Sequence, residues 1–171
     1  MENEIIRELY RRYGKEIQFY LCALCRDDFM AEDLTQETFL KAILSLQQDH
    51  ENMRAWLYTV ARNLFFNRRK KEGREVLREE TESRSDRIRN FENIAGAEEE
   101  LIEKEQKRIL YESISCLSAD KKEVLIMQYF GGLSLKKIAS VTGRTEANVK
   151  VLSFRGKREL RRILEVKGYE L

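Results

Sequence analysis

The sequence predicts an all-α protein in which two small helical domains are joined by a charged, flexible linker. Three observations support this fold class. Apolar residues recur at helical spacing along most of the 171 residues. The chain has no proline and only eight glycines, whereas an all-β fold with many turns needs both. Between the two apolar-rich ends, 15 of the 29 residues in the range 72–100 are charged, a composition that cannot order a core.

The predicted first domain, residues 1–71, contains three helices near residues 3–25, 31–46 and 53–71. In each range the apolar residues return every three or four positions, as they do on the buried side of an amphipathic helix. The buried stripe of the second helix would be Phe39, Ala42, Ile43 and Leu46, and that of the third Met53, Trp56, Leu57, Val60 and Leu64.

Two helices open the predicted second domain, residues 101–171. The first ends near Cys116, and the second begins at the N-cap residue Ser118 and is stopped by Gly131 and Gly132.

A helix-turn-helix follows them. Ser134 caps a short helix, Gly143 ends it, and Thr145 caps a last helix that extends to about Val166. A short helix, a tight glycine turn and a capped second helix are the parts of this DNA-binding motif.

The near-neutral net charge of +2 conceals three charged blocks. Residues 62–74 carry a net charge of +5, residues 79–105 a net charge of −6, and residues 134–167 a net charge of +7. Two basic surfaces separated by an acidic spacer favour two contacts with a polyanion. The alternative is that the blocks are ordinary solvated helix faces.

The last helix has two chemically different sides. Val149, Ser153, Gly156, Leu160 and Ile163 would face the bundle. On the opposite side, Val151 and Phe154 are apolar residues within a basic surface, and such residues favour a binding partner. In a major groove this side offers base contacts early and phosphate contacts late. A structural hairpin with solubilising basic residues is the alternative. The predicted outward side consists of Lys150, Val151, Phe154, Arg155, Lys157 and Arg158.

The second and third predicted helices each carry a polar face that could bind a partner. Asp33, Gln36, Glu37 and Leu40 share one face of the second helix, which by spacing alone is an acidic surface. The predicted outward side of the third helix interleaves aromatic and basic residues, a pattern suited to stacking unpaired bases and neutralising phosphates. Aromatic residues buried against the first helix, with a basic tail in solvent, explain the third helix equally well. Its outward side would be Tyr58, Arg62, Asn63, Phe66, Arg69 and Lys70.

Composition excludes several other classes. Three cysteines are too few for a disulfide scaffold, and Cys22 and Cys25 with the single histidine His50 make no closed zinc set. The chain shows no nucleophile–base pattern and no glycine-rich phosphate loop, which predicts no enzyme, cofactor, metal or small-molecule substrate. The acidic N-terminus and the short apolar run 19–25 predict a cytoplasmic protein.

Three motifs in order identify a family resemblance. AEDLTQETFLKAI (31–43), then WLYTVARN (56–63), then LSADKKEVLIMQYFGGLSLKKIASVTGRTEANVK (117–150) resemble the extracytoplasmic-function (ECF) RNA polymerase sigma factors of bacteria. The resemblance implies region 2 in the first domain and region 4 in the second. It also implies a factor that binds core RNA polymerase and directs promoter recognition and opening in transcription initiation.

The resemblance also implies roles for individual residues. The core-polymerase face, which docks on the clamp helices of the largest subunit, would be Asp33, Gln36, Glu37 and Leu40. The minus-ten DNA would be bound by Asp49, His50 and Asn52 of a base-capturing loop, together with Tyr58, Arg62, Asn63, Phe66, Arg69 and Lys70. The minus-thirty-five DNA would be bound by Arg144, Thr145, Glu146, Asn148, Lys150, Val151, Phe154, Arg155 and Arg158.

The implied partners are core RNA polymerase, including the flap region of its second large subunit, promoter DNA and an anti-sigma factor. The chain departs from the family where Val151 and Leu152 replace the common Ser and Arg, and where the loop before Trp56 is short and polar. Two rival functions fit the residues: a stand-alone helix-turn-helix regulator that binds duplex DNA, and a helical adaptor that binds only protein.

Overall fold

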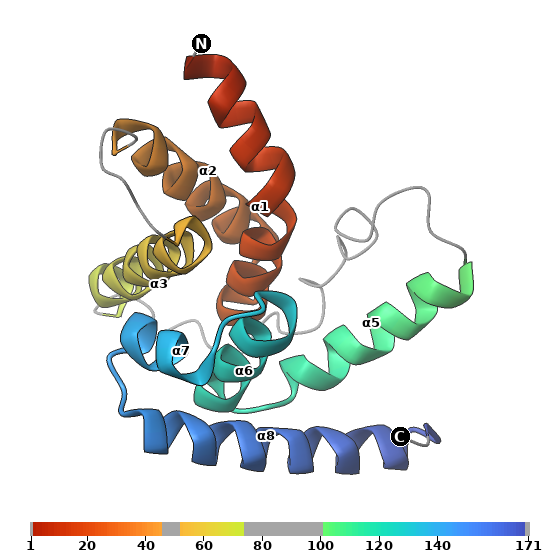
Figure 1. The fold of residues 1–171 in the computed structure, drawn as a ribbon. Helices are drawn as coiled ribbons and strands as arrows, with labels where there is room; N and C mark the ends of the chain where they lie inside the picture. The colour runs from red at the N-terminus through yellow and green to blue at the C-terminus, as the bar shows by residue number, and fades with distance from the viewer. Residues whose placement is uncertain (1, 46–51, 74–100, 170–171) are drawn as a thin grey trace. The chain divides into compact units, whose positions relative to one another are not determined.

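A computed structural model describes residues 2–45, 52–73 and 101–169, and within these ranges all regular elements are helices (Figure 1). The chain divides into two compact units, with helices α1 to α3 in the first and α5 to α8 in the second. The predicted all-α class is therefore confirmed. The predicted linker lies almost entirely outside the described residues, since only Glu72 and Gly73 of it are described.

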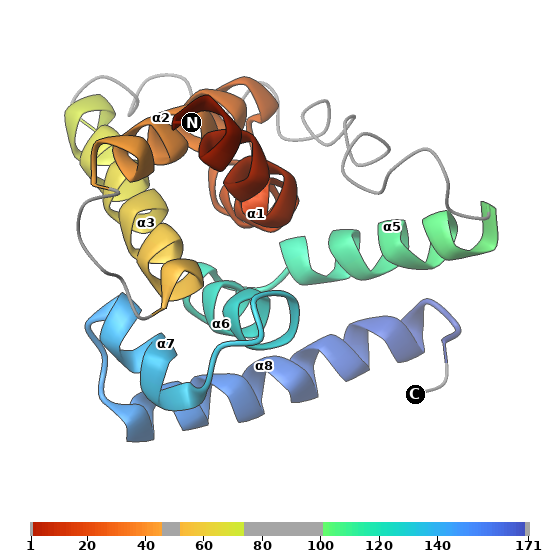
Figure 2. The same cartoon turned by 45° about the horizontal axis from the view of Figure 1, so that its top comes forward.

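The first unit consists of α1 (Glu2–Cys25), α2 (Asp28–Leu44) and α3 (Met53–Glu72). Each of the three helices contacts the other two (Figures 1 and 2). Large side chains fill the space between them, and every helix contributes one that is almost completely buried. Examples are Tyr20 and Leu21 on α1, Leu34 on α2, and Leu57 on α3. Burying such side chains supplies most of the driving force for folding a unit of this size.

The start of α2 lies three residues before the predicted one, at Asp28 rather than Ala31. Arg26 has a positive φ of 52°, which turns the chain sharply after α1. Asp27 then acts as the N-cap, because its carboxylate accepts hydrogen bonds from the backbone N–H groups of Phe29 and Met30. Because the cap residue is Asp27, the helix includes residues 28–30, which lie between the first two predicted helices.

The second unit contains α5 (Leu101–Ser115), α6 (Ala119–Leu125), the π-helix η2 (Ile126–Phe130), α7 (Leu135–Thr142) and α8 (Glu146–Val166). Its core is built from buried residues of several elements, among them Val124, Ile126, Ile138, Val149 and Leu164. The long helix α8 contacts α5, α6 and α7 (Figures 1 and 2).

The predicted caps of the helix-turn-helix are confirmed. The Ser134 hydroxyl accepts a hydrogen bond from Lys137 N at 3.1 Å, and the Thr145 hydroxyl accepts one from Asn148 N at 3.1 Å. Gly143 ends α7 at φ 70°, a left-handed conformation that glycine adopts without steric cost. Ser118 is also an N-cap by its backbone, but its side chain accepts no capping hydrogen bond.

The last turn before Gly131 is wider than predicted. Gly131 N–H donates to Ile126 O at 3.0 Å, five residues back, so the helix that begins after Ser118 ends as a π-helix. Such a turn rotates the side chains that follow relative to an α-helix, and it is often associated with functional sites.

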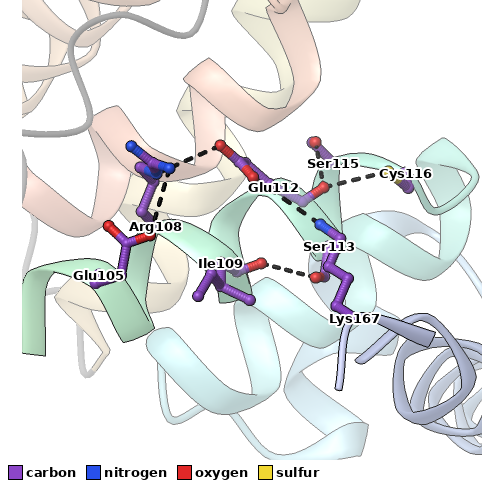
Figure 3. Close-up of polar contacts among 8 residues, drawn as sticks. All are labelled: Glu105, Arg108, Ile109, Glu112, Ser113, Ser115, Cys116 and Lys167. Atoms are coloured by element: carbon purple, nitrogen blue, oxygen red, sulfur yellow. Dashed lines mark hydrogen bonds and ion pairs between the residues drawn. The ribbon is translucent and has the colours of Figure 1, made fainter. Parts of the chain in front are cut away.

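The end of α5 carries a small polar network (Figure 3). The Glu112 carboxylate lies 3.6 Å from Arg108 on the same helix and 3.9 Å from Lys167, just after α8. The Ser113 hydroxyl donates to Ile109 O at 2.7 Å, and the Cys116 thiol donates to Glu112 O at 3.3 Å. The ion pairs are exposed and each contributes little, but they lie where α5 meets the C-terminal end of α8.

Along α8 the approach to α6 is close at Gly156. A Cβ atom built on Gly156 would lie 3.1 Å from Leu125 Cδ1 and 3.4 Å from Lys121 Cβ. Glycine at this position therefore permits the two helices to pack closely.

Candidate nucleic-acid and protein interfaces

The predicted polar face of α2 lies on the surface of the first unit. Asp33, Gln36 and Leu40 are exposed, and Glu37 is half-buried beside them. Leu44, which is not among the predicted residues of this face, is 85% exposed and continues the face one turn beyond Leu40. The i, i+4 spacing from Leu40 would have identified it.

A basic residue of α3 lies against this acidic face. Arg68 Nη2 lies 2.7 Å from Asp33 Oδ2 and 3.6 Å from Glu37 Oε2. Asp33 and Glu37 are one turn apart on α2, so one guanidinium group interacts with both carboxylates. Arg68 therefore belongs to the α2 surface, whereas its neighbours Arg69 and Lys70 are exposed.

The outward side of α3 exposes an aromatic residue among bases. Phe66 is exposed, and the Arg62 guanidinium lies 4.6 Å from the centre of its ring. Asn63, Arg69 and Lys70 are also exposed. An accessible ring with nearby cations is a surface that can stack on a base and neutralise a phosphate.

Tyr58 does not lie on this outward side, so its predicted placement was wrong. Its side chain is fully buried, and its ring packs edge-on against Tyr20 with the ring centres 5.2 Å apart. The interpretation that buries aromatic residues against the first helix therefore holds for Tyr58; Phe65 is buried as well, whereas Phe66 is exposed. The buried stripe of α3 is rotated from the predicted one and consists of Leu57, Tyr58, Ala61, Leu64 and Phe65, while Met53, Trp56 and Val60 are half-buried.

Buried polar groups surround the Tyr58 hydroxyl. Glu16 Oε1 on α1 lies 3.0 Å from Arg54 Nε on α3, and the Arg54 guanidinium also lies 5.3 Å from the centre of the Tyr13 ring. Among the described residues, neither of these two atoms nor the Tyr58 hydroxyl forms a hydrogen bond of good geometry. Burial raises the pKa of Glu16 and of Tyr58, and Arg54 partly opposes both shifts.

Of the three residues predicted for the base-capturing loop, Asn52 is the one that lies within the described residues. Asp49 and His50 lie outside the described residues. Asn52 is the N-cap of α3, and its Oδ1 accepts a hydrogen bond from Ala55 N at 2.9 Å. The side chain of Asn52 thus fixes the point where the loop enters the helix.

The two sides of α8 are as the sequence predicts. Val149 and Ser153 are buried, whereas Val151 is 43% and Phe154 66% exposed. The basic residues beside them are exposed as well, namely Lys150, Arg155, Lys157 and Arg158. An exposed phenylalanine between cations favours a partner that offers both apolar groups and negative charge, as a DNA groove does.

At the N-terminal end of α8 the predicted residues differ in their surroundings. Thr145, Glu146 and Asn148 are exposed in the first turn. Arg144, in contrast, points its guanidinium toward α6, where Nη1 donates to Glu123 at 3.0 Å and Nη2 donates to Asp120 at 2.6 Å. The structure thus separates Arg144 from the exposed residues with which it was predicted to act.

The cysteines of α1 show no sign of reactivity. Burial raises the pKa of the Cys25 thiol to about 12 and that of Cys22 further still, so both stay protonated at neutral pH. Within the described residues no group of three His, Cys, Asp or Glu side chains could hold a metal ion. None of the described helices combines the length and the apolar character that crossing a membrane requires.

Comparisons with known proteins place both units in one class. The family description "Sigma-70 region 2" matches residues 9–75, and "Sigma-70, region 4" matches residues 107–160. The chain therefore has the two regions of a sigma factor of RNA polymerase. The ECF RNA polymerase sigma factor SigM of Bacillus subtilis is 30% identical over 158 residues, which cover 91% of this chain and 93% of SigM. The chain belongs to the ECF sigma factor family and acts in transcription initiation.

Two further similarities agree with this assignment. The RNA polymerase sigma factor YlaC of Bacillus subtilis is 30% identical, over 92% of this chain and 90% of YlaC. Among solved structures, the sigma factor RpoE of Bartonella quintana, crystallised with the anti-sigma factor NepR, aligns with a TM-score of 0.75 at 25% identity. That alignment covers 95% of this chain and 98% of RpoE. The family predicted from the three motifs is confirmed.

Proposed function

We propose that this sigma factor divides promoter recognition between two surfaces, each carried by one unit. The exposed side of α8 reads the minus-thirty-five element, and the exposed side of α3 contacts the minus-ten element. The main support for the proposal is the exposure of an apolar side chain on a basic surface. Phe154 is 66% exposed, and the basic residues Lys150 and Arg155 near it are exposed as well. We also propose that residues 1–71 form the first domain, residues 72–100 the linker and residues 101–171 the second domain.

On α8 the contacts follow the course of the helix. Lys150, Val151, Phe154 and Arg155 lie in the first half and contact base edges and thymine methyl groups, while Arg158 contacts phosphates. The exposed residues of the first turn, Thr145, Glu146 and Asn148, surround backbone amides that attract a phosphate.

On α3 the contacts would be made to DNA that is being opened. Phe66 offers a ring for stacking, Arg62 and Asn63 lie beside it, and Arg69 and Lys70 neutralise phosphates. The loop residues Asp49, His50 and Asn52 complete this proposed site, which captures a base flipped from the non-template strand. Tyr58 has no place in it, because the side chain is fully buried.

Core RNA polymerase would dock on Asp33, Gln36, Glu37 and Leu40 of α2, with Leu44 extending the contact. The charged residues set the orientation, and the exposed leucines bury apolar area against the clamp helices. An anti-sigma factor would compete for the same exposed leucines. RpoE of Bartonella quintana was crystallised with such a partner, which supports the existence of one for this chain. In this proposal the chain works in the cytoplasm and catalyses no reaction itself.

The test is promoter binding and transcription with and without core polymerase at physiological salt. The proposal expects specific binding and correctly started transcripts only when core polymerase is present. Specific binding of the promoter fragment by the free chain would favour the stand-alone regulator. Binding to core polymerase without any effect of promoter sequence would favour the adaptor.

A matched pair of variants tests the surface on α3. Lys70→Ala removes an exposed base. If Lys70 neutralises one phosphate, the logarithm of the promoter-binding constant should depend less steeply on the logarithm of the salt concentration, by ~0.7 for single-stranded and ~0.9 for duplex DNA. Arg68→Ala, two residues away, removes a base that pairs with Asp33, and it should leave that slope unchanged. Equal slopes for Lys70→Ala and the unmodified chain would contradict the assignment of α3.

A further inference from the structure

We propose that Arg144 is a positioning residue of the base-reading helix and not a DNA contact. Its guanidinium bridges Asp120 and Glu123 on α6 and so fixes the N-terminal end of α8. The inference rests on the proposed function of α8 and assigns one of its predicted DNA-binding residues to a different role.

Arg144 lies in the turn that leads into α8, so its contacts affect where this helix begins. It lies between Gly143, which ends α7, and Thr145, which caps α8. The Arg144 backbone N–H also donates to Ala139 O at 3.1 Å. Backbone and side chain therefore hold the turn from two directions, and the first residue with a proposed base contact, Lys150, follows about one and a half helical turns later.

The burial of the partners shows how firmly the guanidinium is held. The Glu123 side chain is 2% exposed and that of Arg144 18%. Removing a cation from beside a buried carboxylate is unfavourable, because water has little access to replace the lost interaction. A DNA phosphate would therefore have to compete with Glu123 for Arg144.

The geometry of the contact requires an arginine. Asp120 and Glu123 are three residues apart on one face of α6, and the two terminal nitrogens of Arg144 donate one hydrogen bond to each carboxylate. A lysine ammonium is a compact charge without this planar fork, so it cannot reproduce both contacts at the same geometry. Lysine would, however, serve well enough as a phosphate contact. This difference separates the two roles.

Two more polar contacts brace α8 from the same side. Lys121 on α6 pairs with Glu159, and Ser153 donates to Gln128 on η2. Together with Arg144, these contacts lie at the start, the middle and the second half of the helix. Arg144 is the bracing residue that precedes the proposed base-reading residues in the chain.

The experiment measures binding of the complex with core polymerase to two promoters, one with the upstream element intact and one with it scrambled, over a series of salt concentrations. Arg144→Lys and Asp120→Asn are the main variants, because neither leaves Glu123 without a nearby cation. The positioning role predicts that both variants lower the intact-to-scrambled affinity ratio several-fold while the salt slope stays unchanged.

A phosphate contact predicts the opposite pattern. Arg144→Lys would then keep the ratio and the slope, Arg144→Ala would lower the slope by ~0.9, and Asp120→Asn would strengthen binding to both promoters because it removes a negative charge. Any of these three results overturns the inference, and so does an unchanged ratio for Arg144→Lys. Thermal unfolding of the free variants identifies any that fail to fold. If the Arg144 variants fail to fold, Asp120→Asn still tests the inference, because the Asp120 side chain is 65% exposed and its replacement should not prevent folding.

Lys150→Ala distinguishes failure of the inference from failure of the proposed function. If α8 binds DNA, this variant lowers the salt slope or the affinity ratio. If it changes neither, the base-reading role of α8 is wrong whatever the Arg144 variants show.

Discussion

The Ser153 hydroxyl on α8 donates a 2.6 Å hydrogen bond to Gln128 Oε1 on the π-helical turn η2. Ser153 is buried on the inner side of α8, away from the exposed surface that carries Phe154. The π-helical turn thus carries the glutamine that accepts this hydrogen bond from the buried side of α8. The π-helical turn η2, which the sequence did not predict, therefore helps to hold α8 in place.

Ser153→Ala should destabilise the second unit by about 1–2 kcal/mol, because the Gln128 oxygen loses its donor. Ser140→Ala, on the exposed side of α7, is the matched control and should change stability by less than about 0.5 kcal/mol. Urea unfolding followed by circular dichroism measures both. Equal effects of the two substitutions would show that the hydrogen bond to Gln128 contributes nothing.

Replacing Asp33, Gln36 and Glu37 together by alanine should weaken binding to core polymerase by about tenfold or more, or ~1.4 kcal/mol, at unchanged helix content. The reason is the loss of the polar surface that would orient docking. Glu4→Ala removes an exposed carboxylate from another helix, α1, and should leave the affinity near that of the unmodified chain. Titration of labelled core enzyme measures both affinities. A triple variant that binds as tightly as Glu4→Ala would refute the docking surface.

Phe154→Ala should reduce transcription from an intact promoter, because removing one base contact costs about 1–3 kcal/mol of discrimination. On a promoter with a scrambled upstream element the same variant should lose little further activity. Arg158→Ala is the comparison, since loss of a phosphate anchor weakens both promoters alike. Equal losses for Phe154→Ala on the two promoters would show that α8 does not read bases.

The Glu16 carboxyl predicts a specific pH dependence of stability. Burial raises its pKa in the folded chain above the ordinary value of 4.5, so the folded state binds this proton more tightly than the unfolded state. Relative to Glu16→Gln, the unmodified chain should therefore be most stable below pH 4.5 and lose that advantage as pH rises through the raised pKa. Each tenfold difference in proton affinity corresponds to about 1.4 kcal/mol.

Glu8→Gln is the control for this measurement. Its exposed carboxylate forms a hydrogen bond with Arg11, which lowers the pKa of Glu8, so the stability difference should change in the opposite direction. Urea unfolding between about pH 4 and 8 measures both variants. A difference between the unmodified chain and Glu16→Gln that does not vary with pH would contradict the buried state of Glu16.

The three cysteines should react with a thiol reagent at very different rates. Cys116 is exposed, whereas Cys22 is buried and Cys25 half-buried with a pKa raised to about 12. At about pH 8 we therefore expect one thiol to react quickly in the folded chain and two only after unfolding. Mass spectrometry of peptides identifies the modified residues. Rapid modification of Cys22 or Cys25 would indicate a reactive pair, and replacing both by serine would then be expected to change activity.

Features set by neighbouring residues were predicted well from the sequence. The caps Ser134 and Thr145 and the turn at Gly143 depend on interactions within a few residues, and the structure confirms all of them. The two sides of α8 were also predicted correctly, because apolar and basic residues separate cleanly along that helix.

Features that depend on residues far apart in the sequence were not predicted. On α3, large apolar residues occur on nearly every side of the helix, so the packing of α1 and α2 decides which of them are buried. That is why Tyr58 was placed outside. The interaction of Arg144 with Glu123 joins residues 21 positions apart, and no local pattern indicates it. The pairing of Arg68 with Asp33 escaped prediction for the same reason.

Gly156 sets how closely α8 packs against α6. A methyl group there would meet Leu125 at 3.1 Å, so α8 and α6 would have to separate by a few tenths of an ångström unless Leu125 moved aside. Lys150 and Phe154 project from the other side of α8, and a rigid displacement would carry them outward together. Gly156, a buried residue with no proposed DNA contact of its own, thus determines how far the proposed DNA contacts of α8 extend.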